Sequence, residues 1–89
     1  MDHVSLDTVI VWTSKMEKAG EYDSSLASRM RVSLQRAESV LDPTRRFLGS
    51  LRRPYLDCVA KALSRHYADA TVKGYVRLLE RARDEYKDM

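Results

Sequence analysis

The chain has 89 residues, of which 44% are apolar and 33% charged, with three glycines and two prolines. This composition is typical of one small, helix-rich globular domain with a net charge of +3; it excludes a disordered chain, and the length excludes a catalytic domain with a second lobe. No apolar run approaches the roughly 18 to 20 residues of a membrane span, and the start, MDHVSLDTVIVW, is too acidic for a signal peptide, so we expect a cytoplasmic chain without a membrane partner.

The first helix is predicted to begin after Ser5, a residue type favoured at helix N-caps, and to end before Gly20. Its apolar residues recur at helical spacing, at Val9, Trp12, Met16 and Ala19.

A second helix is predicted from Asp23 or Ser24, either of which can act as the N-cap, to about Leu41. Its inward-facing residues are Ala27, Met30, Leu34, Ala37 and Leu41.

A short helix is predicted near residues 43–49. Asp42 followed by Pro43 is a strong start signal, because Pro suits the first helical position, and Gly49 suits the end. We expect Phe47 and Leu48 to reach the core from this helix.

A fourth helix is predicted to open at Pro54, with Leu56, Val59 and Leu63 as its buried seam. Cys58 is the only cysteine, so no intrachain disulfide can form. We interpret this cysteine as a small buried apolar residue.

The last helix is predicted to begin at Asp69, acting as its N-cap, and to end near Tyr86. Its apolar residues are Val72, Tyr75, Leu79, Ala82 and Tyr86. The sequence therefore predicts an all-α fold: one compact domain over residues 1–89 with four main helices, arranged as two helix-turn-helix pairs, and the short helix near 43–49.

The two long helices resemble one another at a separation of 45 residues. All five inward positions of the second helix recur 45 residues later on the last one, and Tyr22 precedes one helix as Tyr67 precedes the other. The preceding helices share the pattern LD-V, in Leu6–Val9 and Leu56–Val59. We interpret the chain as a duplicated helix pair; the alternative is chance agreement between two amphipathic helices.

No residue pattern indicates catalysis. His3 and His66 are isolated, and a single cysteine without a close histidine pair argues against a metal site. The chain has no glycine-rich phosphate loop, no HExxH and no G-x-S-x-G. We expect a non-enzyme with no cofactor, no metal and no small-molecule substrate.

Basic residues concentrate in the middle of the chain. Residues 29–65 contain nine Lys and Arg against three Asp and Glu, and arginine predominates. The guanidinium group matches phosphate oxygens in two-point contacts, so this pattern indicates phosphate binding, with a merely solvated basic surface as the alternative. The candidate DNA-binding residues are Arg29, Arg36, Arg45, Arg46, Arg52, Arg53, Lys73 and Arg77.

The order of elements resembles the N-terminal core-binding domain of tyrosine recombinases and phage integrases, a SAM-like helical domain. In that family the second helix of the first unit often opens with T-x-x-x-Y; here Thr71 and Tyr75 have this spacing in the second unit, whereas the first unit has Leu26 and Met30. The resemblance covers Leu6–Tyr86 and implies that the chain clamps one face of double-stranded DNA. These 89 residues do not include the family's catalytic domain, so we expect no tyrosine here to have the nucleophile's role in DNA recombination.

A protein-interaction module is the competing interpretation. Amphipathic helices with heptad-like seams also form homo-oligomers or dock a partner protein. This alternative predicts self-association or an exposed apolar groove, and little response to DNA.

Overall fold

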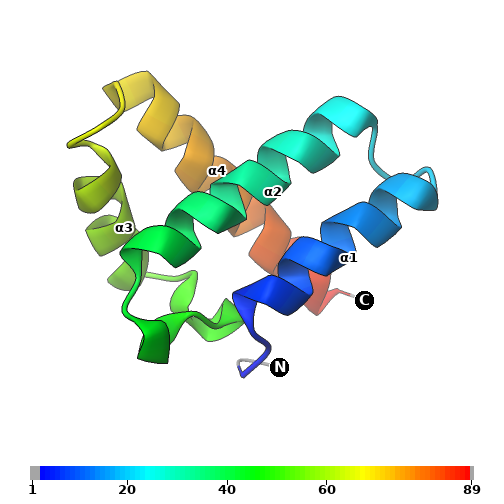
Figure 1. Ribbon diagram of the computed structural model, residues 1–89, viewed down its shortest axis with the longest axis horizontal. Helices are drawn as coiled ribbons and strands as arrows, with labels where there is room; N and C mark the ends of the chain where they lie inside the picture. Colours follow the sequence, from blue (N-terminus) through cyan, green and yellow to red (C-terminus); the bar gives the residue numbers. More distant parts are fainter. Residues whose placement is uncertain (1–2, 89) are drawn as a thin grey trace.

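The computed structural model describes residues 3–88, so both ends of the predicted domain lie outside the described residues. Within that range the chain forms four α-helices: α1 (Leu6–Lys18), α2 (Ser24–Val40), α3 (Tyr55–Leu63) and α4 (Asp69–Lys87). Helices α1 and α2 lie side by side and run in opposite directions, while α4 crosses α2 (Figure 1). The predicted all-α class with four main helices is confirmed.

Helix α2 is the centre of the bundle, since it packs against α1, α3 and α4. All five inward positions predicted for it are buried. On α4, Val72, Leu79 and Ala82 are buried, whereas Tyr75 and Tyr86 are only half-buried. Val76, which the prediction missed, is buried because α4 packs against α3 as well as α2 and so needs a wider apolar stripe.

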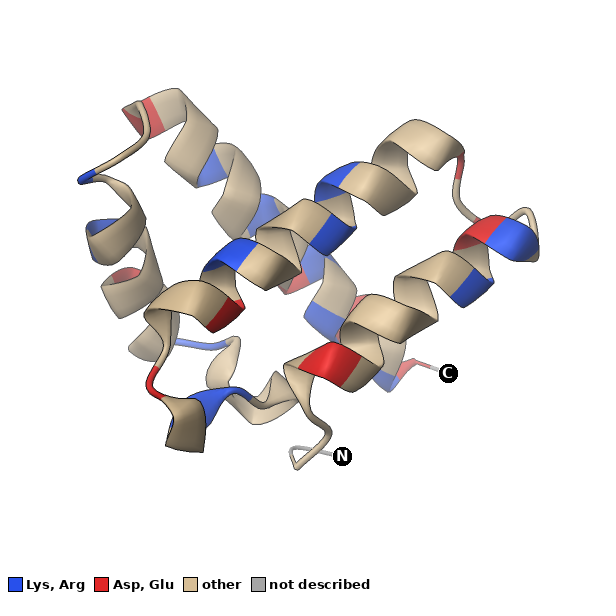
Figure 2. Cartoon of the chain, viewed as in Figure 1, with Lys and Arg blue, Asp and Glu red and all other residues tan. Residues whose placement is uncertain are grey.

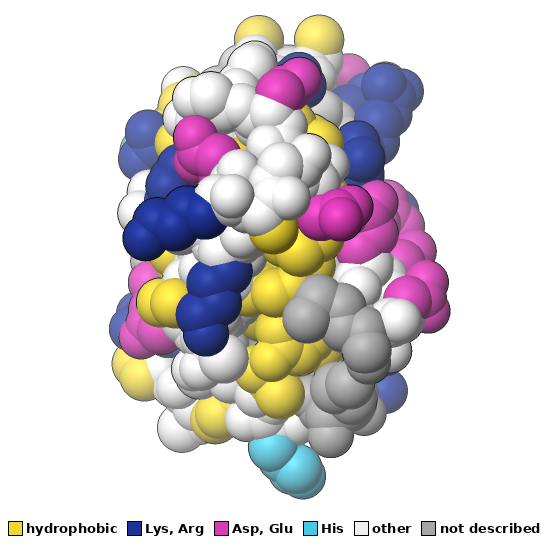
Figure 3. Space-filling view, turned by 90° about the vertical axis from the view of Figure 1, so that its right-hand side faces the viewer, with side chains coloured by type: hydrophobic (Ala, Val, Ile, Leu, Met, Phe, Trp, Pro, Cys, Tyr) yellow, Lys and Arg dark blue, Asp and Glu magenta, His cyan; other side chains and the backbone are white. Residues whose placement is uncertain are grey.

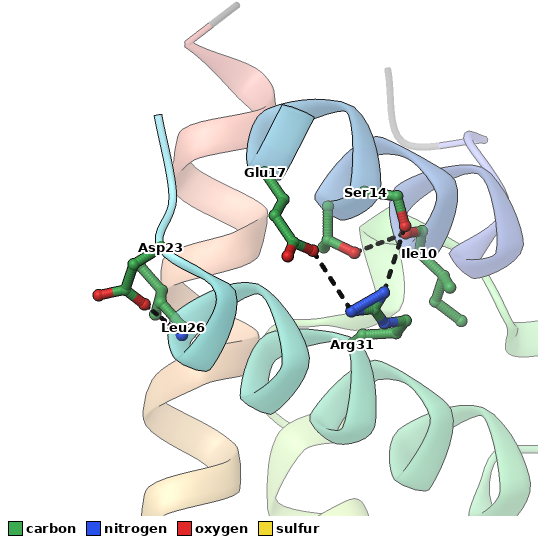
Figure 4. Close-up of polar contacts among 7 residues, drawn as sticks. Ile10, Ser14, Glu17, Asp23, Leu26 and Arg31 are labelled. Atoms are coloured by element: carbon green, nitrogen blue, oxygen red, sulfur yellow. Dashed lines mark hydrogen bonds and ion pairs between the residues drawn. The ribbon is translucent and has the colours of Figure 1, made fainter. Parts of the chain in front are cut away.

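The first helix pair is held by caps and by polar contacts between the helices. Ser5 caps α1 by accepting a hydrogen bond from the backbone N–H of Thr8, and Gly20 follows α1 with φ +78°, a conformation that favours glycine. Figure 4 shows Arg31 of α2 reaching α1, where its guanidinium group donates to Ser14 Oγ at 3.3 Å and lies 3.8 Å from Glu17 Oε1.

Asp23 is the N-cap of α2, since its Oδ1 accepts a hydrogen bond from the backbone N–H of Leu26 at 2.7 Å (Figure 4). The prediction of Asp23 or Ser24 is thereby resolved in favour of Asp23. Helix α4 begins 45 residues after α2, as the sequence repeat predicts.

The predicted short helix near 43–49 is confirmed at its start, where Asp42 caps a 3₁₀ turn that begins at Pro43, but it is not one continuous helix. The segment forms two 3₁₀ turns, Pro43–Arg45 and Leu48–Ser50, with Phe47 extended between them. Backbone groups that a continuous helix would use bond instead to the chain around the start of α1. The N–H of Leu6 donates to the carbonyl of Arg46, and the N–H of Leu48 donates to the carbonyl of Val4. Leu48 is buried as expected, and Phe47 is half-buried.

Two predictions for the second helix pair are also wrong. Ala68, not Asp69, is the N-cap of α4, and it offers no side-chain hydrogen bond, so the first turn is uncapped by a side chain. Cys58 is exposed, because it lies beside Asp57 on the outer side of α3 while Leu56 and Val59 take the inner side.

Candidate nucleic-acid interface

The predicted basic residues come from α2, from the connector between α2 and α3, and from α4. Figure 2 shows bands of Lys and Arg along both α2 and α4, which cross one another. Most of these residues line one of three hollows in the surface.

The α3–α4 cleft is the largest of these hollows, with a volume of about 460 Å³. It brings together three predicted residues that are far apart in sequence: Arg53 from the connector, and Lys73 and Arg77 from α4. Lys61 of α3 completes the basic lining. The prediction missed Lys61, although its place one helical turn after Asp57 on the outer side of α3 is a signal that could have found it.

Carboxylates offset part of this charge. Arg53 is hydrogen-bonded to Asp57, and Lys73 Nζ lies 3.1 Å from Asp69 Oδ2. The lysine and aspartate side chains are 66% and 82% exposed, so water screens the pair and it holds little free energy. Glu80 also lines the cleft, whereas Arg77 forms no ion pair with any residue of 3–88.

The α2–α4 groove lies on the other side of α4, with a volume of about 300 Å³. Its lining residues are small, hydroxyl-bearing or apolar except for one arginine: Ser28, Arg29, Val32, Thr71, Gly74, Tyr75 and Leu78. No carboxylate is among them, so the groove is basic where the α3–α4 cleft is mixed in charge.

Tyr75, which lines this groove, belongs to an aromatic pair. The rings of Tyr67 and Tyr75 meet edge to face, with centroids 5.5 Å apart and planes at 89°. The Arg36 guanidinium group lies over the Tyr67 ring, 5.5 Å from its centroid. Tyr75 was predicted to face the core, but it is half-buried and lines the groove with part of its surface.

The third group of basic residues lies on the connector between α2 and α3. Arg45 and Arg52 line a hollow of about 400 Å³ together with Tyr55, and the Arg45 guanidinium group lies 4.9 Å from the centroid of the Tyr55 ring. Asp42 is nearby in sequence, and its pKa is lowered by hydrogen bonds from the side chain and backbone N–H of Thr44, so it stays ionised.

Arg46 differs from the other seven candidates because its side chain donates a hydrogen bond to the backbone. It is half-buried, and its Nε donates to the carbonyl of Leu41 at 3.2 Å, just beyond the end of α2. This contact satisfies a carbonyl that has no partner within the helix. Arg46 is therefore a structural residue first.

The face on the right of Figure 1, where α1 ends, α2 begins and the chain ends after α4, is different. Figure 3 shows Lys and Arg on it together with Asp and Glu, and hydrophobic side chains gathered between them. Val11 of α1 is 55% exposed. A polyanion would meet charges of both signs here, as in the α3–α4 cleft, but also the hydrophobic side chains between them, so we do not assign phosphate binding to this face.

Comparison with known proteins gives no match: no protein-family model, no curated protein and no solved structure matches this chain. Across residues 3–88, no helix is long and apolar enough to span a membrane. In the same range, no three side chains of His, Cys, Asp and Glu are grouped so that they could hold a metal ion.

Proposed function

We propose that the chain binds double-stranded DNA through phosphate contacts and carries out no catalytic step. The observation that supports the proposal is the convergence of Arg53, Lys61, Lys73 and Arg77 on the α3–α4 cleft. Phosphate contacts supply most of the affinity in non-specific protein–DNA complexes, and half or more of all protein–DNA hydrogen bonds go to the backbone.

The ion pairs of the cleft do not prevent this role. Lys73 and its partner Asp69 are both largely exposed, so exchanging the carboxylate for a phosphate costs little. Lys73 and Arg77 are four residues apart on α4 and therefore lie one above the other on its outer face. Two adjacent cations in this arrangement suit the phosphates of one strand. The resemblance to recombinase core-binding domains points to the same ligand.

Binding of a short labelled duplex, measured by fluorescence anisotropy over a range of salt concentrations, tests the proposal. The double variant Lys73→Ala/Arg77→Ala is expected to bind about tenfold more weakly at low salt. The slope of log binding constant against log salt concentration should become shallower by about 2, because the variant contacts two fewer phosphates and so releases about two fewer counterions. The matched control is Lys15→Ala/Lys18→Ala, which removes the same charge from α1. Equal losses in both variants, or no binding at low salt, would refute the cleft as the contact.

A second candidate is an interaction module that binds another copy of the chain. The exposed Val11 and the hydrophobic side chains on the face in Figure 3 favour it. Val11→Glu should leave the fold intact because the side chain is exposed, and it should abolish any concentration-dependent sedimentation. A wild-type protein that sediments as a monomer at every concentration would exclude this candidate.

A further inference from the structure

The α2–α4 groove contains a glycine that the fold does not need. Gly74 lies within α4, where glycine costs about 1 kcal/mol relative to alanine. A Cβ atom at Gly74 would meet nothing within 4 Å, and its φ is not positive, so neither packing nor backbone conformation requires glycine. Because Gly74 has no side chain, the space above it in the groove is open.

The walls of the groove suit a flat apolar ring. Val32 and Leu78 supply apolar surface, and Tyr75 supplies an aromatic ring that is held edge-on by Tyr67. Ser28 and Thr71, whose hydroxyl groups can each donate and accept a hydrogen bond, also line the groove. A volume of about 300 Å³ is at the small end of the range for ligand pockets.

The lining of the groove carries positive charge and no carboxylate. Arg29 is its only charged lining residue, and Arg36 lies next to it over the Tyr67 ring. The matching ligand is therefore an anionic chain that carries flat rings. A nucleic-acid strand has this chemistry, but in a regular duplex its bases are stacked and paired, and only an unpaired base can enter a groove between two helices.

We propose that the α2–α4 groove takes one unpaired nucleobase of a DNA strand, with the base stacked on Tyr75 and the flanking phosphates at Arg29 and Arg36. This inference rests on the proposed function, because it assumes a DNA ligand, and it extends it: the chain prefers bulged, melted or single-stranded sites to perfect duplex. Stacking on aromatic side chains tolerates any base, so the preference is for an unpaired state rather than for a sequence.

Two single strands of equal length test the proposal: oligothymidine, and a strand of abasic sites that carries the same phosphates without bases. Wild-type protein should bind oligothymidine about tenfold more tightly, the value of one stacked base. Gly74→Leu fills the groove without changing any charge and should remove the preference. Gly74→Ala is the matched control and should keep it. Circular dichroism and thermal melts establish that both variants fold.

The outcomes separate this inference from the duplex-binding proposal. Loss of the base preference in Gly74→Leu, with perfect-duplex binding unchanged, supports the groove as a base site. Equal wild-type affinity for the two strands overturns the inference, and so does a preference that Gly74→Leu leaves intact. An acidic peptide with apolar side chains that binds wild type but not Gly74→Leu, without any thymidine preference, would assign the groove to a protein partner and also overturn it. Duplex binding lost only in Lys73→Ala/Arg77→Ala bears on the cleft alone.

Discussion

The two helix pairs place equivalent tyrosines in opposite surroundings. Tyr22, before α2, is buried edge-on against Trp12, with centroids 5.7 Å apart, and its hydroxyl donates to Glu85 of α4. Tyr67, which comes 45 residues later and precedes α4, is half-buried. Its ring contacts Tyr75 and carries Arg36 on one face.

The difference shows how one helix-pair plan serves two purposes. Tyr22, Glu85 and Arg81 each contact the other two. Arg81 Nε lies 2.7 Å from Glu85 Oε2, and the Arg81 guanidinium group also lies over the Tyr22 ring. Burial would raise the pKa of Glu85, but the hydrogen bonds from Tyr22 and Arg81 outweigh it and lower that pKa. The contacts around Tyr22 thus fasten the end of α4, whereas Tyr67 and Tyr75 of the second pair are partly exposed beside Arg36 of α2, where a ligand can reach them.

The largest expected effect on stability comes from replacing the two equivalent tyrosines with alanine. Tyr22→Ala removes a buried aromatic side chain and should lower the free energy of unfolding by about 3 to 5 kcal/mol, close to the whole stability of a small domain. Tyr67→Ala removes a half-buried ring and should cost about 1 kcal/mol. Urea denaturation followed by circular dichroism measures both.

Tyr22→Phe sharpens the result, because it removes only the hydrogen bond to Glu85 and should cost about 1 kcal/mol. Similar losses for Tyr22→Ala and Tyr67→Ala would mean that the two pairs are equally closed, contrary to the structure.

Local signals in the sequence predicted most of the helical framework. The bounds of α1 followed from Ser5 and Gly20, and the buried face of α2 followed from its apolar spacing, because both depend on neighbours within a few residues. Asp42 and Pro43 also marked the start of the segment after α2, but its break into two 3₁₀ turns could not be predicted in this way. Its backbone pairs with Val4 and Leu6, some 40 residues earlier, and no local pattern reports that contact.

The candidate site was predictable as chemistry but not as geometry. Charge alone singled out Arg53, Lys73 and Arg77, yet only the packing of α3 against α4 brings them to one cleft. Arg46 was indistinguishable in sequence from the arginines beside it, and its hydrogen bond to Leu41 depends on how the chain turns after α2. Burial, convergence and backbone contacts are properties of the assembled fold.

The second prediction concerns the unequal caps of α2 and α4. Asp23→Ala removes the side-chain acceptor for the backbone N–H of Leu26 and should cost about 1 kcal/mol. At the equivalent position, Ala68 has the extended backbone of an N-cap without an acceptor, so Ala68→Ser should raise the free energy of unfolding by about 0.5 to 1 kcal/mol. Chemical denaturation of the two variants measures both changes. A destabilising Ala68→Ser would show that the start of α4 gains nothing from a cap.

The smallest expected effect concerns a pair of carboxyl groups between α1 and α2. A hydrogen bond with Asp7, followed by burial and the charge of Asp7, raises the pKa of Glu38, and Arg46 opposes the rise. The positions in the second pair that correspond to Asp7 and Glu38 are Asp57 and Arg83, which carry opposite charges. The first pair therefore tolerates a like-charge contact that the second pair avoids.

The raised pKa sets the sign of the pH dependence. Between the ordinary carboxyl pKa and the raised one, the folded chain binds more protons than the unfolded chain at Glu38, so this group makes the protein less stable as pH rises. Glu38→Gln keeps the hydrogen-bonding shape without the charge. It should stabilise the protein at pH 7 by about 0.5 kcal/mol, the size of a like-charge pair on a helix surface, and the gain should vanish below the ordinary carboxyl pKa. Thermal melts of both proteins across this range measure the difference, and added salt should shrink it. A gain that is the same at every pH would show that the Glu38→Gln substitution acts through packing and not through the charge of the pair.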